Sequence, residues 1–205
     1  MLEKTRIGVL VSGGGTNLQA LIDAQKSGII TSGEIKLVVS SRDDAYALTR
    51  AANAGIKAVA VNRKDCRSLA EFEEKILAEL KAEGIEMIVL AGFMSILSAD
   101  FTNQYKDRII NVHPALIPSF CGEGMYGLKV HEAALAYGVK VTGATVHFVN
   151  EVPDGGKIIL QKAVDILPED TAETLQKRVM ENAEWIILPR ACEIVSKQIA
   201  ESKGE

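Results

Sequence analysis

Residues 7–17, IGVLVSGGGTN, decide the fold, because an uninterrupted apolar run meets a glycine-rich turn and a helical pattern follows. Leu18, Leu21 and Ile22 recur after the turn at the spacing of one helix face. An apolar run without alternation is typical of a strand that is buried on both faces. The segment therefore predicts a strand, a tight turn and a helix in direct succession.

The same alternation continues through the first half of the chain. Helical patterns separate further apolar runs, which lie at residues 35–40, 58–62, 85–92 and 108–113. The clearest helix is predicted to begin after Ser68, with Glu71 completing a capping box, and to end at Gly84. Strands of this kind between helices predict a doubly wound α/β fold around a mostly parallel sheet.

The pattern changes after residue 113. A glycine-rich stretch at residues 119–128, which we expect to be a mobile loop, precedes a short helix near residues 129–137. Two apolar strands at residues 141–150 and 156–166 then flank the loop EVPDG. A short loop of Pro, Asp and Gly predicts that these strands form an antiparallel pair attached to the sheet.

The last part of the chain is predicted to be helical from about Thr171. Asp170 is the expected N-cap, and Pro189 is expected to kink or restart the helix. No repeat or linker divides the sequence, so residues 1–205 are predicted to form one domain.

The composition is that of an ordinary globular protein. The 205 residues are 47% hydrophobic and 24% charged, which is enough apolar material for one substantial core. A net charge of −4 and a pI near 5.5 argue against a surface that neutralises polynucleotide phosphates. No apolar run approaches the roughly 20 residues of a membrane span. The run at residues 7–11 is also too short for the core of a signal peptide.

Three cysteines, Cys66, Cys121 and Cys192, are odd in number and widely spaced. They form neither a disulfide framework nor a CxxC metal clip, and they are typical of reduced thiols in the cytosol. We therefore expect a soluble cytoplasmic protein with no nucleic-acid or membrane partner.

The turn at residues 12–17, SGGGTN, is a candidate phosphate-binding loop. Glycines let the backbone approach a ligand, and the following helix start offers free N–H groups and a partial positive charge. The turn lacks the GxGxxG spacing, since Leu18 stands in place of the third glycine, and it lacks the GK[ST] of a P-loop. A tight turn without a ligand remains an alternative.

Asn111, His113 and Asp154 are the candidate catalytic residues. The first two share one face of the strand at 108–113 and lie near its carboxyl end, where open α/β sheets bind ligands. An Asn amide can donate to a developing oxyanion, and a His can exchange a proton near neutral pH. Asp154 lies in a loop whose two following glycines give the backbone freedom. A structural His and an ordinary turn aspartate remain the alternatives.

The other two histidines have weaker claims to a function. His147 lies inside an apolar strand, which predicts a core or pocket-lining position, whereas His131 is predicted to lie on the surface of a short helix. The three histidines show neither HxH nor HExxH spacing, so no metal site is expected.

Over nearly its whole length, the sequence resembles the phosphoribosylglycinamide formyltransferases of purine synthesis. The similarity follows a fixed order of motifs: VLVSGGGTNLQALIDA, VLAGFMSILS, NVHPALIPSF and TGATVHFVNEVPDGGKIILQ. The SGGGTN loop separates this family from other formyl transferases of the same fold. The resemblance implies a Rossmann-like formyltransferase fold. It also implies 10-formyltetrahydrofolate as co-substrate, with no metal, and small-molecule partners only.

The resemblance implies a formyl-transfer reaction that belongs to de novo purine synthesis. The amine of N1-(5-phosphoribosyl)glycinamide takes the formyl group, which gives the N2-formyl product and tetrahydrofolate. Asn111 and protonated His113 would stabilise the oxyanion, and Asp154 would pair with His113 and relay the proton through a water.

The resemblance also assigns binding residues. The predicted substrate-binding residues are Gly14, Gly15, Thr16, Asn17 and Glu184, with Lys64 or Arg67 as a second phosphate contact. The predicted cofactor-binding residues are Phe93, Met94, Ser95, Ile96, Leu97, Val149, Asn150 and Asp154. Residues 1–110 would form the phosphate-substrate half of the domain, and residues 111–205 the catalytic and folate-binding half. Ser95 departs from the family, in which Arg is frequent at this position, and Trp185 stands where many members have His.

Three rival functions remain open. A methionyl-tRNA formyltransferase would share the three catalytic residues but add an RNA-binding domain and a basic surface. A formyltetrahydrofolate hydrolase would carry a regulatory domain before the first strand. A non-catalytic nucleotide or folate sensor would keep the fold alone. Either a monomer or a homodimer is compatible with the sequence.

Overall fold

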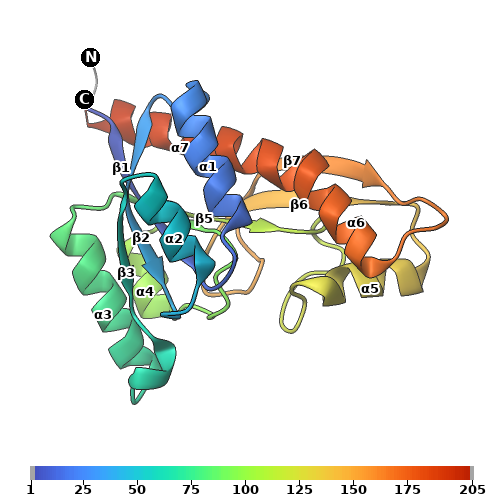
Figure 1. Cartoon of the computed structure of the whole chain (residues 1–205), viewed down its shortest axis with the longest axis horizontal. Coiled ribbons are helices and arrows are strands. Elements are labelled where there is room, and N and C mark those ends of the chain that lie inside the picture. The colour runs from blue at the N-terminus through green and yellow to red at the C-terminus, as the bar shows by residue number, and fades with distance from the viewer. Residues whose placement is uncertain (1–2, 204–205) are drawn as a thin grey trace.

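One sheet of seven strands forms the centre of residues 3–203, the part of the chain that the computed structural model describes. The predicted domain of residues 1–205 extends two residues beyond this part at each end. The strand order is β3-β2-β1-β4-β5-β6-β7 (Figure 1). The strands are β1 (Thr5–Val11), β2 (Gly33–Ser40), β3 (Lys57–Ala60), β4 (Met87–Leu90), β5 (Ile109–His113), β6 (Val141–Phe148) and β7 (Ile158–Asp165).

Helices connect the parallel strands and follow the last strand. They are α1 (Thr16–Ser27), α2 (Tyr46–Asn53), α3 (Leu69–Ala82), α4 (Ala99–Gln104), α5 (Leu128–Tyr137), α6 (Ala172–Val179) and α7 (Trp185–Ser202). A 3₁₀ turn, η1, lies at Arg63–Asp65, and a π-helical turn, η2, lies at Met180–Glu184.

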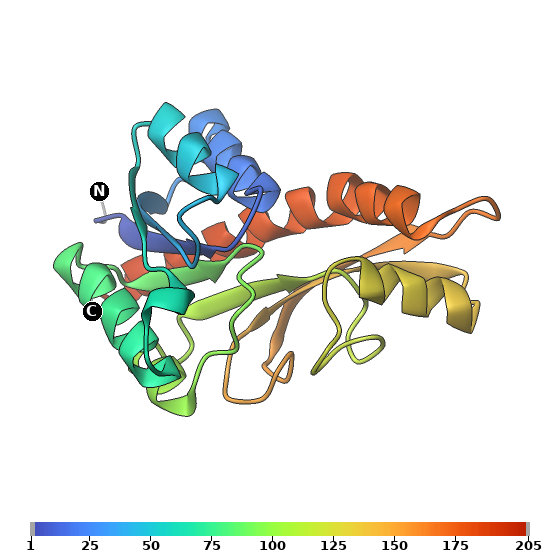
Figure 2. The same cartoon turned by 60° about the horizontal axis from the view of Figure 1, so that its bottom comes forward.

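Strand directions confirm the predicted fold class, a doubly wound and mostly parallel sheet with an antiparallel pair in the C-terminal half. Strands β1 to β5 are parallel to one another, and β6 and β7 form the predicted antiparallel pair. Strand β6 is also antiparallel to β5. Figure 2 shows the resulting extension of the sheet away from the parallel half, with α5 and α6 beside it.

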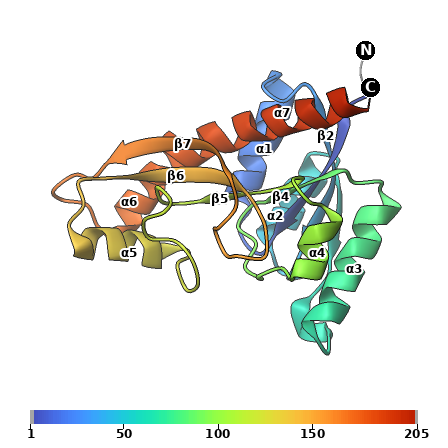
Figure 3. The same ribbon diagram turned by 180° about the vertical axis from the view of Figure 1, so that it is seen from behind.

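The two faces of the parallel half are covered by different helices (Figure 3). Ile7, Val9 and Val11 of β1 share a core with α1 and α7, whereas Leu10 packs with α3 and α4 on the opposite face. Successive side chains of a strand point to opposite faces. The apolar run lacks alternation because both of its faces are buried.

The ends of two helices differ from the predicted caps. Ser68 caps α3 by accepting a hydrogen bond from the Glu71 amide, as predicted, but the Glu71 carboxylate accepts from the amide of Arg67 and not from that of Ser68. The N-cap of α6 is Thr171, not Asp170, since Thr171 and Thr174 form a reciprocal capping box. The carboxylate of Asp170 is held outside the helix.

Asp170 is held by three other contacts. It accepts hydrogen bonds from the Leu167 amide and the Thr174 hydroxyl, and it pairs with the guanidinium of Arg178. Because these contacts hold the Asp170 side chain in the turn before α6, Thr171 caps the helix instead.

Pro189 lies inside α7 and does not restart the helix. The irregular turn lies earlier, at η2, where the helix takes a π-helical turn that ends one turn before the proline. Proline provides no N–H for the carbonyl four residues before it, and π-helical turns are a common site of helix distortion. The irregular turn of this helix therefore lies N-terminal to Pro189 and not at the proline itself. No helix within residues 3–203 has the length and apolar character to cross a membrane.

Candidate active site

The carboxyl ends of β1, β4 and β5 meet at one edge of the sheet, and the loops that follow them surround a cleft of about 390 Å³. Open α/β sheets bind ligands at this edge. Asn111 and His113 reach the cleft from β5, and Asp154 reaches it from the loop between β6 and β7. The structure thus brings together the three residues that the sequence predicts to be catalytic.

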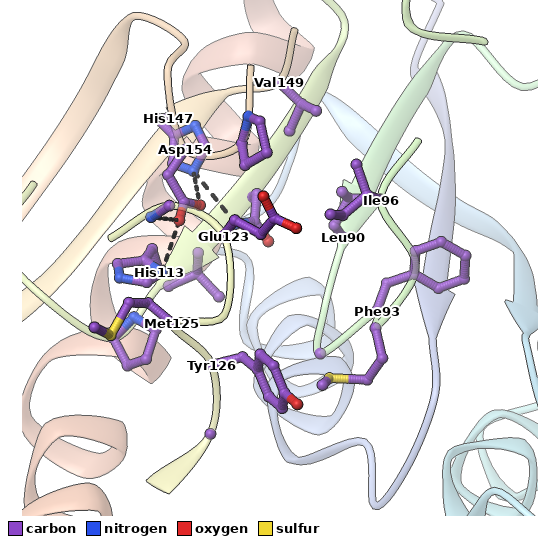
Figure 4. A pocket seen from close by; sticks show the side chains of 18 of the residues that line it. Leu90, Phe93, Ile96, His113, Glu123, Met125, Tyr126, His147, Val149 and Asp154 are labelled. Carbon is purple, nitrogen blue, oxygen red and sulfur yellow. Dashed lines mark hydrogen bonds and ion pairs between the residues drawn. The ribbon is translucent and has the colours of Figure 1, made fainter. Parts of the chain in front are cut away.

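Asp154 lies between two imidazoles (Figure 4). Its Oδ2 is 3.4 Å from Nδ1 of His113, and its Oδ1 is 3.4 Å from Nε2 of His147. The backbone N–H of Gly122 donates to Oδ2 at 2.9 Å. The carboxylate therefore connects two neighbouring strands with the loop that follows β5.

Two backbone features hold Asp154 in place. Its φ of 56° is left-handed, a region that Asp tolerates better than most residues. A Cβ on Gly156 would lie 1.7 Å from the carbonyl oxygen of Phe148, so only glycine lets the chain pass so close to β6. The loop bearing Asp154 is thereby fixed against the strand bearing His147.

Strand register places His147 opposite Asn111 and Thr145 opposite His113. The Thr145 hydroxyl donates to the carbonyl of Ala115 at 2.7 Å and accepts from the amide of Ile117 at 3.1 Å. These bonds fix the turn that follows His113.

His147 orients the amide of Asn111. Its Nδ1 is 2.7 Å from the carbonyl of Phe148, which assigns the proton to Nδ1. Its Nε2 lies 3.3 Å from Nδ2 of Asn111 and also faces Asp154. Nε2 accepts from Asn111 when the ring is neutral and donates to Asp154 when the ring is protonated. His147 lines the cleft, as predicted, but no local sequence pattern indicates its contacts with Asn111 and Asp154.

The surroundings of His113 favour its neutral form. Burial lowers the pKa of His113 below its usual value and outweighs the charge of Asp154 and the bond to the Phe120 carbonyl, which both raise it. Nε2 of His113 lies 2.8 Å from that carbonyl, so Nε2 carries the proton and Nδ1 faces Asp154.

Asp154 remains a carboxylate. Burial alone would raise the pKa of Asp154, but the hydrogen bonds from His147 and Gly122 and the charge of His113 together hold this pKa below its usual value. Near neutral pH, the pair is therefore a carboxylate beside a neutral imidazole.

His131 lies in the interior, and the prediction of a surface position is wrong. Its side chain on α5 is fully buried and lines the cleft, and neither ring nitrogen has a hydrogen-bond partner within the described chain. Burial, followed by the charge of His113, lowers its pKa to about 4. The helix turns Val130, His131 and Ala134 inward together, and α5 packs against α6, which did not follow from the short local pattern.

All residues predicted to bind the cofactor line the cleft. Phe93 and Ile96 stand across it from Asp154 (Figure 4). Met94, Ile96 and Val152 leave more than half of their surface exposed around the opening, at 57%, 58% and 54%. Apolar side chains gathered around a cleft are typical of a site for a largely apolar ligand.

The SGGGTN turn at residues 12–17, called the glycine loop from here on, lies at the other end of the cleft. Gly15 is the N-cap of α1 with a left-handed φ of 71°, and Asn17 donates to the carboxylate of Glu184 at 2.8 Å. Asn17 and Glu184 line the cleft, whereas Gly14 and Thr16 are exposed beside it. Burial raises the pKa of Glu184, against the opposing effect of the Asn17 bond.

Lys64 and Arg67 are exposed in the segment between β3 and α3 and lie outside the lining of the cleft. Ser12, which the sequence did not single out, joins the two ends of the cleft. Its hydroxyl accepts from the Met94 amide at 2.9 Å and is 2.7 Å from the hydroxyl of Ser41. A serine at the end of β1 gives no local signal of such a bridge.

Comparison with known proteins bears on this site. Residues 5–192 match the family described as formyl transferase. The chain is 42% identical over 184 residues to the phosphoribosylglycinamide formyltransferase of Haemophilus influenzae, which covers 90% of this chain and 84% of that protein. It is also 42% identical over 194 residues to the human trifunctional purine biosynthetic protein adenosine-3, covering 95% of this chain. The chain spans only 18% of that larger protein, and 14% of its counterpart from Drosophila melanogaster.

Two solved structures superpose closely on this chain. Glycinamide ribonucleotide transformylase 1 from Symbiobacterium toebii superposes with a TM-score of 0.87 at 40% identity, covering 97% of this chain and 89% of that one. Phosphoribosylglycinamide formyltransferase from Brucella melitensis gives a TM-score of 0.86 at 40% identity, covering 95% and 96%.

Proposed function

Because the chain belongs to the formyl transferase family, and within it to the phosphoribosylglycinamide formyltransferases, we propose that it formylates N1-(5-phosphoribosyl)glycinamide with 10-formyltetrahydrofolate. The products would be the N2-formyl compound and tetrahydrofolate, in de novo purine synthesis. The convergence of Asn111, His113 and Asp154 at the centre of one cleft is the observation that carries the proposal.

Asn111 is proposed to stabilise negative charge on the formyl oxygen. When His147 is neutral, its Nε2 accepts one N–H of the Asn111 amide. The second N–H is then free to donate into the cleft, and a donor fixed in advance stabilises an oxyanion without reorganisation.

His113 and Asp154 are proposed to handle the proton that leaves the attacking amine. Asp154 stays ionised because its pKa is low, and its charge stabilises the imidazolium of His113 when that ring takes up a proton. The protonated ring then supports the same oxyanion. A water next to Asp154 would pass the proton on to N10 of the folate as the bond between N10 and the formyl carbon breaks, which releases tetrahydrofolate.

The cleft suits the two proposed ligands at opposite ends. The apolar walls formed by residues 93–97 and 149–152 fit a folate ring system, and 10-formyltetrahydrofolate would bring the activated formyl carbon to Asn111. Glu184 would accept from the ribose hydroxyls, and Gly14, Gly15, Thr16 and Asn17 would bind the phosphate. Lys64 or Arg67 is proposed as a further phosphate contact.

The remaining parts of the proposal concern setting and assembly. We propose a cytoplasmic enzyme that needs no metal, acts as one domain and works as a monomer or a homodimer. Its partners would be small molecules. Residues 1–110 would form the phosphate-substrate half of the domain, and residues 111–205 the catalytic and folate-binding half.

A substrate comparison tests the function. Release of the folate product, followed by absorbance, should be rapid with glycinamide ribonucleotide and absent with initiator methionyl-tRNA. Transfer to the tRNA, or water-dependent deformylation without an amine acceptor, would favour one of the rival enzymes. Binding of folate without turnover would favour a sensor.

A further inference from the structure

Helix α2 holds the glycine loop from outside the cleft. The N–H of Ala47 donates to the carbonyl of Gly13 at 3.1 Å, and Nε of Arg50 donates to the carbonyl of Gly14 at 2.8 Å. A Cβ on Gly15 would lie 2.7 Å from Cβ of Ala47, so the loop and the helix are in direct contact. Two successive carbonyl groups of the loop therefore point toward α2.

This arrangement aims the loop's amides away from α2. In a trans peptide unit the C=O and the following N–H point in opposite directions. The N–H groups of Gly14 and Gly15 therefore face away from Ala47 and Arg50, and neither is used in a hydrogen bond within residues 3–203. They add to the free N–H groups at the start of α1, where anions bind.

Arg50 keeps an uncompensated positive charge at this point. Its Nη1 donates to the side-chain oxygen of Gln19 at 3.1 Å, and its guanidinium lies 5.0 Å from the centre of the Tyr46 ring. Within the described residues it forms no ion pair, whereas Arg42 is paired with Asp44 in the loop before α2. The first turn of α1 also lacks an acidic residue. The loop is thus positively polarised by both the helix and the guanidinium.

We infer that Arg50 is a positioning residue for the substrate phosphate: it holds the Gly14 carbonyl so that the loop amides face the ligand, and its positive charge lies behind the loop. This inference rests on the proposed function and adds a residue to it. Lys64 and Arg67 have no hydrogen bond with the loop, whereas Arg50 is already in contact with it. Arg is suited to this role because its separate N–H groups hold the Gly14 carbonyl and the Gln19 side chain at once, while the guanidinium keeps its charge.

The test compares two acceptors, glycinamide ribonucleotide and glycinamide riboside, which lacks the phosphate. Arg50→Gln should raise KM for the ribonucleotide by about 10- to 100-fold, the scale of a charge-assisted hydrogen bond. The KM for folate, kcat and the KM for the riboside should stay within a few-fold of those of the unaltered protein. Arg50→Lys, which keeps the charge but not the fork, should recover part of the loss. Arg42→Gln, which removes an exposed and paired arginine, is the matched control and should leave all constants unchanged.

Several outcomes would overturn the inference. An equal loss with both acceptors would make Arg50 a purely structural residue, and unchanged KM for the ribonucleotide would remove it from phosphate binding. A phosphate-selective loss in Lys64→Gln or Arg67→Gln but not in Arg50→Gln would assign the contact to that residue. If the unaltered protein transfers no formyl group at all, the proposed function fails. Calorimetric binding of ribose 5-phosphate to Arg50→Gln and to the unaltered protein then decides the role of Arg50 independently.

Discussion

At the scale of single residues, the site depends on how Asp154 is shared between two histidines. One oxygen faces His113 and the other faces His147, so the same carboxylate affects the proposed proton carrier and the ring that contacts Asn111. Removing its charge should therefore change chemistry at two points while leaving the cleft intact.

His113→Ala should fold normally and lose formyl transfer. General acid–base groups contribute about 10²- to 10⁴-fold, so we expect a fall of that size in kcat, with substrate and folate binding changed much less. Circular dichroism checks folding, and steady-state kinetics measures the loss. A folded variant with nearly normal turnover would show that His113 has no part in the mechanism.

Asp154→Asn should lower kcat by roughly 10²-fold. The Asp154 charge raises the pKa of His113 against the effect of burial, so the variant should show a still lower His113 pKa by NMR titration. Asp165→Asn, at an exposed position of β7, is the matched control. Reduced thermal stability with normal kcat and an unchanged His113 titration would mean that Asp154 is only a turn residue.

His131 should make the fold sensitive to mild acid. Its pKa of about 4 in the folded protein is below the value of 6.5 for a free imidazole, so the unfolded chain takes up the proton first as the pH falls. Its contribution to stability is complete above pH 6.5 and is lost as the pH falls toward 4, a change of about 3 kcal/mol.

Urea unfolding of the unaltered protein and of His131→Gln, measured across this pH range, isolates that contribution. The difference in the free energy of unfolding between the two proteins should change steadily between pH 6.5 and 4. A constant difference would mean that His131 is not held neutral by its surroundings.

At the scale of elements, α1 and α2 together shape the glycine loop. Gly15→Val would place a branched side chain at a φ of 71° and against Ala47. We expect a marked loss of affinity for glycinamide ribonucleotide, with folate affinity nearly retained, as measured by calorimetry. Gly13→Ala, whose added Cβ has nothing within 4 Å, is the control and should cost far less. Equal loss of both ligands in Gly15→Val would contradict a phosphate role for the loop.

Local sequence patterns predict helices, strands and turns better than they predict which distant residues contact one another. The strand-to-helix rhythm, the glycine loop and the antiparallel pair follow from apolar spacing and turn residues, and the structure confirms them. The contact between Asn111 and His147 depends on the register of β5 against β6, which no local period encodes. The same holds for Arg50, whose partner is a backbone carbonyl 36 positions earlier in the chain.

Burial also explains the wrong prediction for His131. The sequence predicts a surface position because a ten-residue helix shows little contrast between its faces, whereas the packing of α5 against α6 decides which face is inside. The roles of Asn111, His113 and Asp154 stay predictions, although the structure places them together.

At the scale of the whole molecule, the cleft joins the beginning of the chain to its end. The bond between Asn17 and Glu184 spans 167 positions, and it lies next to Trp185, the single tryptophan. We expect contacts so distant along the chain to form late in folding. Closing so long a loop costs conformational entropy, and this cost falls once the intervening parts are already ordered. A chain that has folded its first four strands would therefore have the proposed phosphate loop but not the proposed ribose contact at Glu184.

The proposed ribose contact at Glu184 thus reports completion of the fold, and the intrinsic chromophore Trp185 is its neighbour in the sequence. During refolding from urea, transferase activity should return together with Trp185 emission and later than helical circular dichroism. Activity that preceded the emission change would mean that the bond between Asn17 and Glu184 is dispensable. The same geometry predicts that a fragment lacking residues 171–205 would keep the glycine loop but lose formyl transfer, because Glu184 would be missing from the cleft.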